Sequence, residues 1–323
     1  MPVQTFTTLN DPLAIQGTQA FGINAAGDIV GSYATATSMN GLLFSGGTYT
    51  TIADPLATFT QALGINAAGQ IVGLYGNNAP GTHGFLLSGG TYTTIDDPSA
   101  TNITEAFGIN DRGQIVGAYT NASGDHGFLL SGGVYTTLDD SAGVQAHDTQ
   151  AIGINNAGQI VGTFQNASGT HGFLLSGGVY TTLDDPLGTG RTLATGINNA
   201  GQIVGFYVDS AGQQHGFLYS GGFYTTIDAP SVTNGTQAWG INDNGQIVGL
   251  YVNASGTHGF LEITVPNPPA PPGTTADMIL RAANTSPIAG QYETYDIGSN
   301  AILAGYSLGQ VGTDWGFVTL GGL

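Results

Sequence analysis

Hydrophobic and polar positions alternate along the chain in short runs that are typical of β-strands. One repeat reads "QALGIN", a turn at "AAG" and "QIVGLY", and then, after a polar loop, "HGFLLS" and "TYTTID" on either side of a Gly-Gly pair. Such a pair supplies the two positive φ angles of a two-residue hairpin turn. Helical spacing is nowhere sustained, so we predict four antiparallel strands per repeat, named a to d in chain order, and an all-β fold.

The asparagine of the triplet "GIN" marks six copies of this unit. The copies lie at Asn24, Asn66, Asn110, Asn155, Asn198 and Asn242, with a period of 42 to 45 residues. Four short strands at this period are typical of one blade of a β-propeller. The chain begins with a lone d-like strand near Thr5 to Asn10, and the sixth repeat stops after strand c. We therefore predict that residues 1–264 form a six-bladed β-propeller closed by an N-terminal strand latch.

The repeat pattern ends after the sixth copy. Residues 265–276 form a proline-rich linker, which we expect to be extended. Residues 277–323 contain four further β-like runs, "MILRAA", "QYETYDI", "AILAGYSL" and "WGFVTL". Two interpretations stay open for this segment, a small β module or a divergent seventh blade, and the long linker favours the module.

The Gly-Gly turn also sets the register of strands c and d. It places His83 opposite Asp96, at a distance where a side-chain contact is expected. In the first repeat both positions differ, because Asn40 and Ala53 stand there. We interpret the pairs as structural, since one histidine and one aspartate are an incomplete ligand set for the alternative, a zinc site. The predicted pairs are His83 with Asp96, His126 with Asp139, His171 with Asp184, His215 with Asp228, and His258 with Asn10 of the latch strand.

A ligand site is expected in the central channel, which the innermost strand a lines. The first position of this strand reads Gln19, Gln61, Glu105, Gln150, Leu193 and Gln237 around the ring. Its amides and its carboxylate would hydrogen-bond a sugar or a solvated ion, or else one another and water. Residues that break the repeat symmetry are further candidates, in loops or at strand ends: Asp111, Arg112, His147, Arg191 and Trp239.

Aspartates recur where strand d leaves the sheet, at Asp11, Asp54, Asp97, Asp140 and Asp185. Aspartate before proline is a turn starter that accepts backbone N–H bonds. Calcium is the competing interpretation because carboxylates gather at this face. No calcium-loop motif occurs, so we predict no metal and no cofactor.

Composition narrows the class of partner. The 323 residues include three arginines, no lysine and 21 acidic residues, for a net charge of −18. A nucleic-acid partner is excluded because no basic surface can be built. No apolar run is long enough to cross a membrane. The chain has no cysteine and no visible signal peptide, and its oligomeric state is left open.

The six copies of "GINxxGQIVGxY" followed by "HGFLxSGGxYTTID" resemble the bacterial extracellular HAF repeat family, over residues 1–262. The tail from Asp277 is similar to a single FG-GAP or VCBS-like module. The resemblance implies an extracellular, secreted protein and no established activity.

We therefore expect a secreted, acidic binding or surface-interaction module for glycans or an extracellular matrix component. The alternative is a carbohydrate-active enzyme, a lyase or a glycosidase, acting at the channel mouth. Binding is favoured because glycoside hydrolysis needs two carboxylates and the inner ring holds one.

Overall fold

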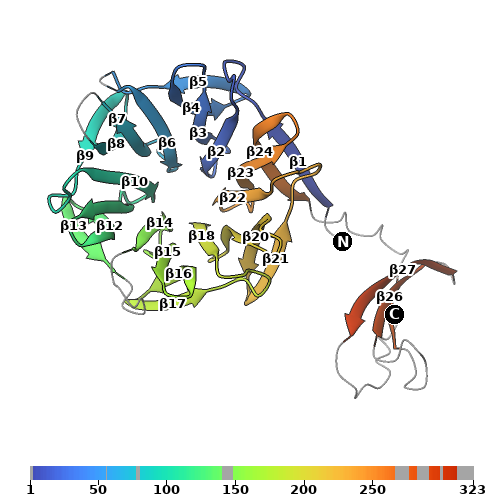
Figure 1. The fold of residues 1–323 in the computed structure, drawn as a ribbon. Coiled ribbons are helices and arrows are strands. Elements are labelled where there is room, and N and C mark those ends of the chain that lie inside the picture. Colours follow the sequence, from blue (N-terminus) through green and yellow to red (C-terminus); the bar gives the residue numbers. More distant parts are fainter. Residues whose placement is uncertain are drawn as a thin grey trace. The chain divides into compact units, whose positions relative to one another are not determined.

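The computed structural model describes residues 3–55, 57–77, 81–139, 148–265, 276–281, 291–298 and 301–310. Contacts divide the chain into two compact units, one spanning Gln4–Val265 and one containing the C-terminal strands. The first unit is a ring of six four-stranded antiparallel blades around a central axis (Figure 1). No helix occurs among the described residues, so the chain is all-β as predicted, and none of its described elements is a helix able to span a membrane.

Each blade has the predicted order a, b, c, d from the axis outwards, as Figure 1 shows. The a strands are β2 (Thr18–Ile23), β6 (Phe59–Ile65), β10 (Ile103–Ile109), β14 (Gln150–Ile154), β18 (Thr192–Ile197) and β22 (Thr236–Ile241). The b strands are β3 (Ile29–Ala34), β7 (Ile71–Gly76), β11 (Ile115–Asn121), β15 (Ile160–Asn166), β19 (Ile203–Val208) and β23 (Ile247–Asn253). The c strands are β4 (Met39–Ser45), β8 (Thr82–Ser88), β12 (Gly124–Ser131), β16 (Gly169–Ser176), β20 (Gln214–Ser220) and β24 (Gly256–Val265). The d strands are β5 (Thr48–Ile52), β9 (Thr91–Ile95), β13 (Val134–Leu138), β17 (Val179–Leu183), β21 (Phe223–Ile227) and β1 (Val3–Leu9).

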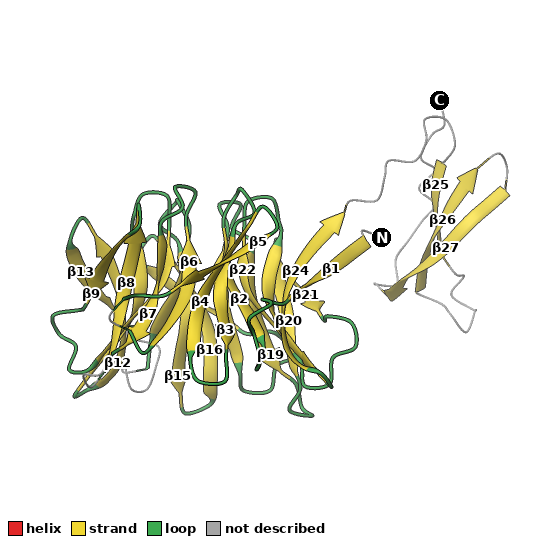
Figure 2. Cartoon of the chain, turned by 90° about the horizontal axis from the view of Figure 1, so that it is seen from above, coloured by secondary structure: helices red, strands yellow, loops and turns green. Residues whose placement is uncertain are grey.

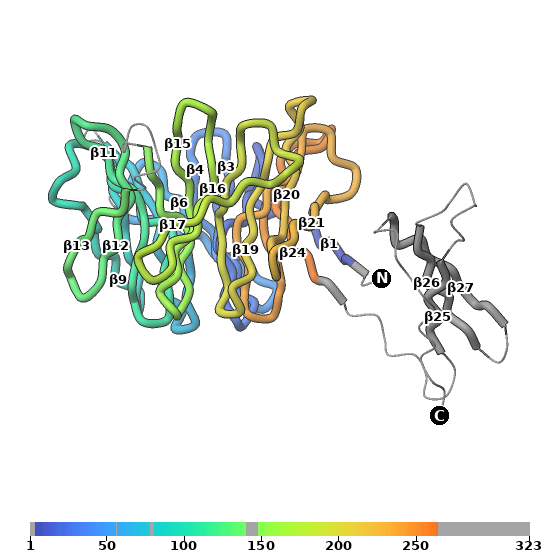
Figure 3. The backbone as a smooth tube through the Cα atoms, turned by 90° about the horizontal axis from the view of Figure 1, so that it is seen from below, coloured from blue at the N-terminus to red at the C-terminus, as the bar shows by residue number. Residues whose placement is uncertain are grey.

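The ring is closed by the N-terminal strand. β1 pairs with β24 and is the fourth strand of the sixth blade, and the two lie side by side in Figure 3. The hydroxyls of Thr8 and Tyr251 lie 2.9 Å apart, which repeats the contact between Thr94 and Tyr75 in the second blade. The predicted strand latch is therefore present, in the register of a normal d strand.

The hydrophobic core lies between neighbouring blades. A phenylalanine of strand c is fully buried in five of the six blades, at Phe85, Phe128, Phe173, Phe217 and Phe260. In one such layer, Val72 and Ile95 of the second blade pack with Ala106 and Phe128 of the third. Strands from all blades run between two faces that carry the turns and loops (Figure 2). Each blade is stabilised by its two neighbours, so closing the ring removes two exposed apolar faces.

Glycine lets the a strands approach each other closely at the axis. A Cβ added to Gly64 would lie 2.8 Å from the carbonyl oxygen of Phe107 in the next blade. The c–d hairpins need glycine for a different reason, since Gly89 and Gly90 have φ of 56° and 81°. Both glycine motifs therefore have a steric cause, and the a-strand glycine occurs in all six blades and the Gly-Gly pair in the five that have a c–d hairpin.

The C-terminal unit contains its own antiparallel sheet of β25 (Ala276–Arg281), β26 (Gln291–Gly298) and β27 (Ala301–Gln310). These strands correspond to three of the four β-like runs predicted there. The fourth run, "WGFVTL", and nearly all of the proline-rich linker lie outside the described residues.

Candidate functional site

The predicted ring of amides lines a cavity at one mouth of the channel. Gln19, Gln61, Glu105, Gln150 and Gln237 all contribute to the wall of this cavity, whose volume is about 430 Å³. We call it the glutamine cavity. Leu193, which holds the sixth ring position, is absent from the described lining. The a strands thus bring together five residues that are far apart in the chain, as their shared strand position predicted.

An apolar layer lies below the glutamine ring and separates it from the other mouth. One side chain from each a strand lines the cavities on both sides of this layer, namely Phe21, Leu63, Phe107, Ile152, Thr195 and Trp239. The rings of Phe21 and Trp239 meet edge to face, with centroids 5.3 Å apart. Sequence reasoning singled out Trp239 as a loop or strand-end residue, which was wrong, because it lies within β22. Strand alternation could have predicted this apolar layer, because each of its six side chains follows a residue of the glutamine ring by two positions and so lies on the same face of strand a.

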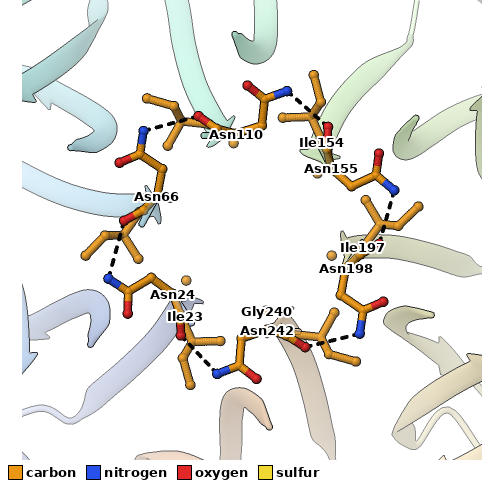
Figure 4. Close-up of a pocket in the computed structure, with 18 of the residues that line it drawn as sticks. Ile23, Asn24, Asn66, Asn110, Ile154, Asn155, Ile197, Asn198, Gly240 and Asn242 are labelled. Atoms are coloured by element: carbon orange, nitrogen blue, oxygen red, sulfur yellow. Dashed lines mark hydrogen bonds between the residues drawn. The ribbon is translucent and has the colours of Figure 1, made fainter. Parts of the chain in front are cut away.

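The opposite mouth is bordered by a ring of six asparagines. The side-chain Nδ2 of each asparagine donates to the backbone oxygen of the equivalent asparagine in the next blade (Figure 4), at 2.9 to 3.3 Å. We call this set the asparagine ring: Asn24, Asn66, Asn110, Asn155, Asn198 and Asn242. The last bond, from Asn242 to Asn24, joins the sixth blade to the first.

Each asparagine also folds the a–b turn of its own blade. In the second blade, Asn66 Oδ1 accepts from the backbone N–H groups of Ala68 and Gln70, at 3.1 and 3.0 Å. Its Nδ2 also donates to Gln70 Oε1 at 2.8 Å. The polar atoms of the asparagine ring are therefore occupied by the protein itself, so this ring joins the blades and offers little to a ligand. The six "GIN" copies were the sequence signal for it.

The side chains around the glutamine cavity are held to different degrees. Gln237 is fixed at both ends, because its Oε1 accepts from Trp239 Nε1 at 3.0 Å and its Nε2 donates to Gln214 Oε1 at 2.6 Å. Glu105 is different. Desolvation by burial, and then the charge of Asp125, raise the pKa of its carboxyl above the usual value, and no hydrogen bond opposes this shift. Glu105 is therefore the one ionisable group among the described residues of the cavity wall.

The predicted contacts between histidine and aspartate are present on the outer strands. Nδ1 of the histidine lies 2.9 to 3.1 Å from the carboxylate in all four pairs, which are His83 with Asp96, His126 with Asp139, His171 with Asp184, and His215 with Asp228. His258 Nδ1 lies 2.9 Å from Oδ1 of Asn10 on the latch side, as expected. In the first blade, asparagine stands at the histidine position, and Asn40 Nδ2 donates to Ser38 Oγ at 3.1 Å.

Three of these histidines have a serine as a second partner, which the sequence did not predict, and His215 Nε2 lies 3.4 Å from Asp209 Oδ2. Ser123 Oγ lies 2.8 Å from His126 Nε2, so Ser123, His126 and Asp139 resemble a catalytic triad. However, Ser123 Oγ donates its proton to Asn121 Oδ1 at 2.6 Å. The hydroxyl is thus tied to the amide, and the arrangement closes the "NAS" loop of strands b and c. The same contacts recur at His171 and His258.

Asp11, Asp97 and Asp185, which follow strand d, act as turn starters. Oδ1 of Asp11 accepts from the backbone N–H of Leu13 at 2.8 Å, and Asp97 and Asp185 make the same bond to Ser99 and Leu187. Asp140 and His147 lie outside the described residues. Among the described side chains, no three His, Asp or Glu residues gather in a group that would hold a metal ion.

Comparison with known proteins supports the fold. No protein-family model matches the chain, and no curated protein matches it in sequence. Among solved structures, a putative gluconolactonase aligns at a TM-score of 0.50 and 11% identity, covering 82% of this chain and 94% of that one. TolB from Acinetobacter baumannii aligns at a TM-score of 0.51 and 13% identity, covering 76% of this chain and 64% of that one. A six-bladed propeller lectin of Aleuria aurantia aligns at a TM-score of 0.49 and 12% identity, covering 83% of this chain and 100% of that one. At such identities the likeness concerns the fold alone, and the protein is a six-bladed β-propeller.

Proposed function

We propose that the protein is a binding module that takes one unit of a glycan into the glutamine cavity. The observation that carries the proposal is the composition of this cavity, which has about 430 Å³ of space, a wall of carboxamides with one carboxylate, and an aromatic floor that includes Trp239. Amides and carboxylates hydrogen-bond hydroxyl groups, and aromatic rings pack against the apolar faces of sugar rings. Ligand sites of this kind combine apolar walls with a few polar groups.

The alternative of a carbohydrate-active enzyme has less support in the cavity. Hydrolysis of a glycoside needs two carboxylates on either side of the bond. Glu105 is the only carboxylate among the described residues that line the cavity. Asp125 is close enough to raise the pKa of Glu105, but it is not part of the described lining. Binding without turnover is therefore the favoured function.

A glycan array followed by isothermal titration calorimetry on the full chain tests the proposal. Gln150→Ala should weaken binding about fivefold, the effect expected for one lost hydrogen bond. Gln165→Ala is the matched control, since Gln165 is an exposed glutamine of the same blade that does not line the cavity. Equal affinities of the two variants would place the ligand elsewhere. A reducing-sugar assay on the bound glycan, if it shows turnover, would replace this proposal by the enzyme.

The place of action belongs to the same proposal. We propose that the protein acts outside the cell, on glycans or matrix at a surface. Support comes from the resemblance of its repeats to the HAF family and from its charge of −18, which keeps a protein soluble and disfavours nucleic acid. Detection of the native protein in the culture medium would support this location, and its recovery only from the cell interior would contradict it.

A further inference from the structure

Among the described residues that line the glutamine cavity, Glu105 is the one with an ionisable carboxyl, and none is a cation. Glu105 lies on β10 with its side chain in the cavity wall. Desolvation raises the pKa of its carboxyl, and the neighbouring charge of Asp125 acts in the same direction. A partly desolvated carboxylate is costly when neither a cation nor a hydrogen-bond donor compensates it. The other ring positions carry neutral side chains, so glutamine would have satisfied the fold here.

No cation of the described chain compensates Glu105. The protein has three arginines and no lysine. Arg112 follows Asn110, so it lies at the a–b turn beside the opposite mouth, and Arg191 is exposed. Neither residue lines the glutamine cavity. A cationic ligand group would therefore meet no described positive charge in the cavity wall.

The rest of the cavity favours a cation of a particular kind. Phe21, Phe107 and Trp239 line the same space as Glu105. Aromatic faces attract an ammonium group, and a nearby carboxylate adds a charge-assisted hydrogen bond. Gln19 Oε1 accepts from Ser32 Oγ at 3.3 Å and Gln61 Nε2 donates to Met39 Sδ at 2.8 Å, so the other polar atom of each of these amides can bond a hydroxyl group. The cavity therefore combines the groups that recognise an amine with the groups that recognise a polyol.

We propose that the bound glycan unit is an amino sugar with a free, protonated amine, which pairs with Glu105 against the aromatic floor. This inference rests on the proposed function and deepens it, because it names the class of sugar that the same cavity takes. An N-acetylated sugar lacks the positive charge and would leave Glu105 unbalanced. The protein would thus distinguish deacetylated from acetylated glycan units.

The test compares three monosaccharides, glucosamine, N-acetylglucosamine and glucose, by calorimetry and ligand-observed NMR on the full chain at neutral pH and low salt. We expect glucosamine to bind about tenfold more tightly than glucose or N-acetylglucosamine, the effect of one charge-assisted hydrogen bond. Added salt should reduce this preference, since it screens the ion pair. Equal affinities of glucosamine and glucose would overturn the amine proposal and leave glycan binding intact. Absence of binding for all three sugars and for the glycan array would overturn both.

Two variants locate the preference. Glu105→Gln should abolish the preference for glucosamine over glucose. Asp125→Asn is the matched control, because it removes a neighbouring carboxylate that does not line the described cavity, and it should change the glucosamine affinity less than twofold. An unchanged preference in Glu105→Gln would refute the proposed ion pair. The comparison of sugars on the unmodified protein does not depend on either variant folding.

Discussion

The asparagine ring should contribute strongly to the stability of the propeller, and Asn155 gives the sharpest test. Asn155 is 3% exposed. Its Nδ2 donates to the Asn198 oxygen at 3.1 Å and to Gln159 Oε1 at 2.8 Å. Its Oδ1 accepts from the backbone N–H groups of Ala157 and Gln159, both at 3.0 Å. Asn155→Ala removes these four hydrogen bonds, whose partners are the buried Asn198, the half-buried Gln159 and the exposed Ala157.

The magnitude follows from the number of lost bonds. At about 1 kcal/mol of net stability for each hydrogen bond, Asn155→Ala should lower the free energy of unfolding by about 4 kcal/mol. Domains are typically stable by about 5–15 kcal/mol, so the variant should be close to the limit of folding at physiological temperature. Urea denaturation followed by tryptophan fluorescence measures the loss. A loss below about 1 kcal/mol would refute the reasoning, since it would mean that water or relaxed turns replace the bonds.

Asn155→Asp separates the two halves of this contribution. The introduced carboxylate keeps the acceptor for Ala157 and Gln159 but loses both donated bonds, and it faces the carbonyl oxygen of Asn198. Burial and this oxygen should raise the pKa of the introduced carboxyl in the folded state above its unfolded value of about 3.9. The penalty relative to the unmodified protein should therefore be largest at neutral pH and shrink as the pH falls through the raised pKa. A penalty that does not vary with pH would contradict the donor role of Nδ2.

Two further predictions concern the outer hairpins and the axis. Burial lowers the pKa of His215, but hydrogen bonds and charges from Asp228 and Asp209 outweigh it and raise the pKa above its ordinary value. The stability that Asp228 contributes should thus be complete below about pH 6.5 and fall as the pH rises through the folded pKa of His215. The difference in unfolding free energy between the unmodified protein and Asp228→Asn should therefore become smaller as the pH rises. A difference that stays constant with pH would disprove this. At the axis, Gly64→Ala places a Cβ 2.8 Å from a neighbouring backbone oxygen and should lower the free energy of unfolding in urea by about 3 kcal/mol. Gly69 has open space around it and a φ of 72°, so Gly69→Ala should lower it by about 1 kcal/mol. Equal losses would show that backbone strain, not blade spacing, governs both sites.

Much of the fold was predictable because its determinants are local and repeated. The Gly-Gly pairs set the register of each c–d hairpin, and this register alone places His83 beside Asp96. The incomplete first and last repeats likewise predict the latch, and with it the contact of His258 with Asn10. Both predictions use strand alternation and chain order, which the sequence displays directly.

The asparagine ring was not predicted, because its bonds run between blades. Each asparagine donates to the backbone of the next copy, and the sixth donates to the first. The spacing between blades depends on the close approach of glycines such as Gly64 to a neighbouring carbonyl. The sequence of a single repeat shows neither the hydrogen bond to the next asparagine nor the distance from a glycine to the carbonyl of the next blade. The serine beside His126 was missed for a related reason, since the loop that presents it takes its shape from Asn121.

The repeats are identical at the asparagine that joins the blades and differ at the position that faces the glutamine cavity. All six copies keep the asparagine of the ring, whereas the cavity position reads glutamine four times, glutamate once and leucine once. A six-fold symmetric ring can offer only six equal sites or one site on its axis. A single carboxylate at Glu105 and a single indole at Trp239 remove that symmetry on the axis and make one site with a defined orientation. Nearly identical blades can therefore bind one asymmetric ligand per molecule. The asparagine ring joins the blades, and other residues of the same a strands line the glutamine cavity.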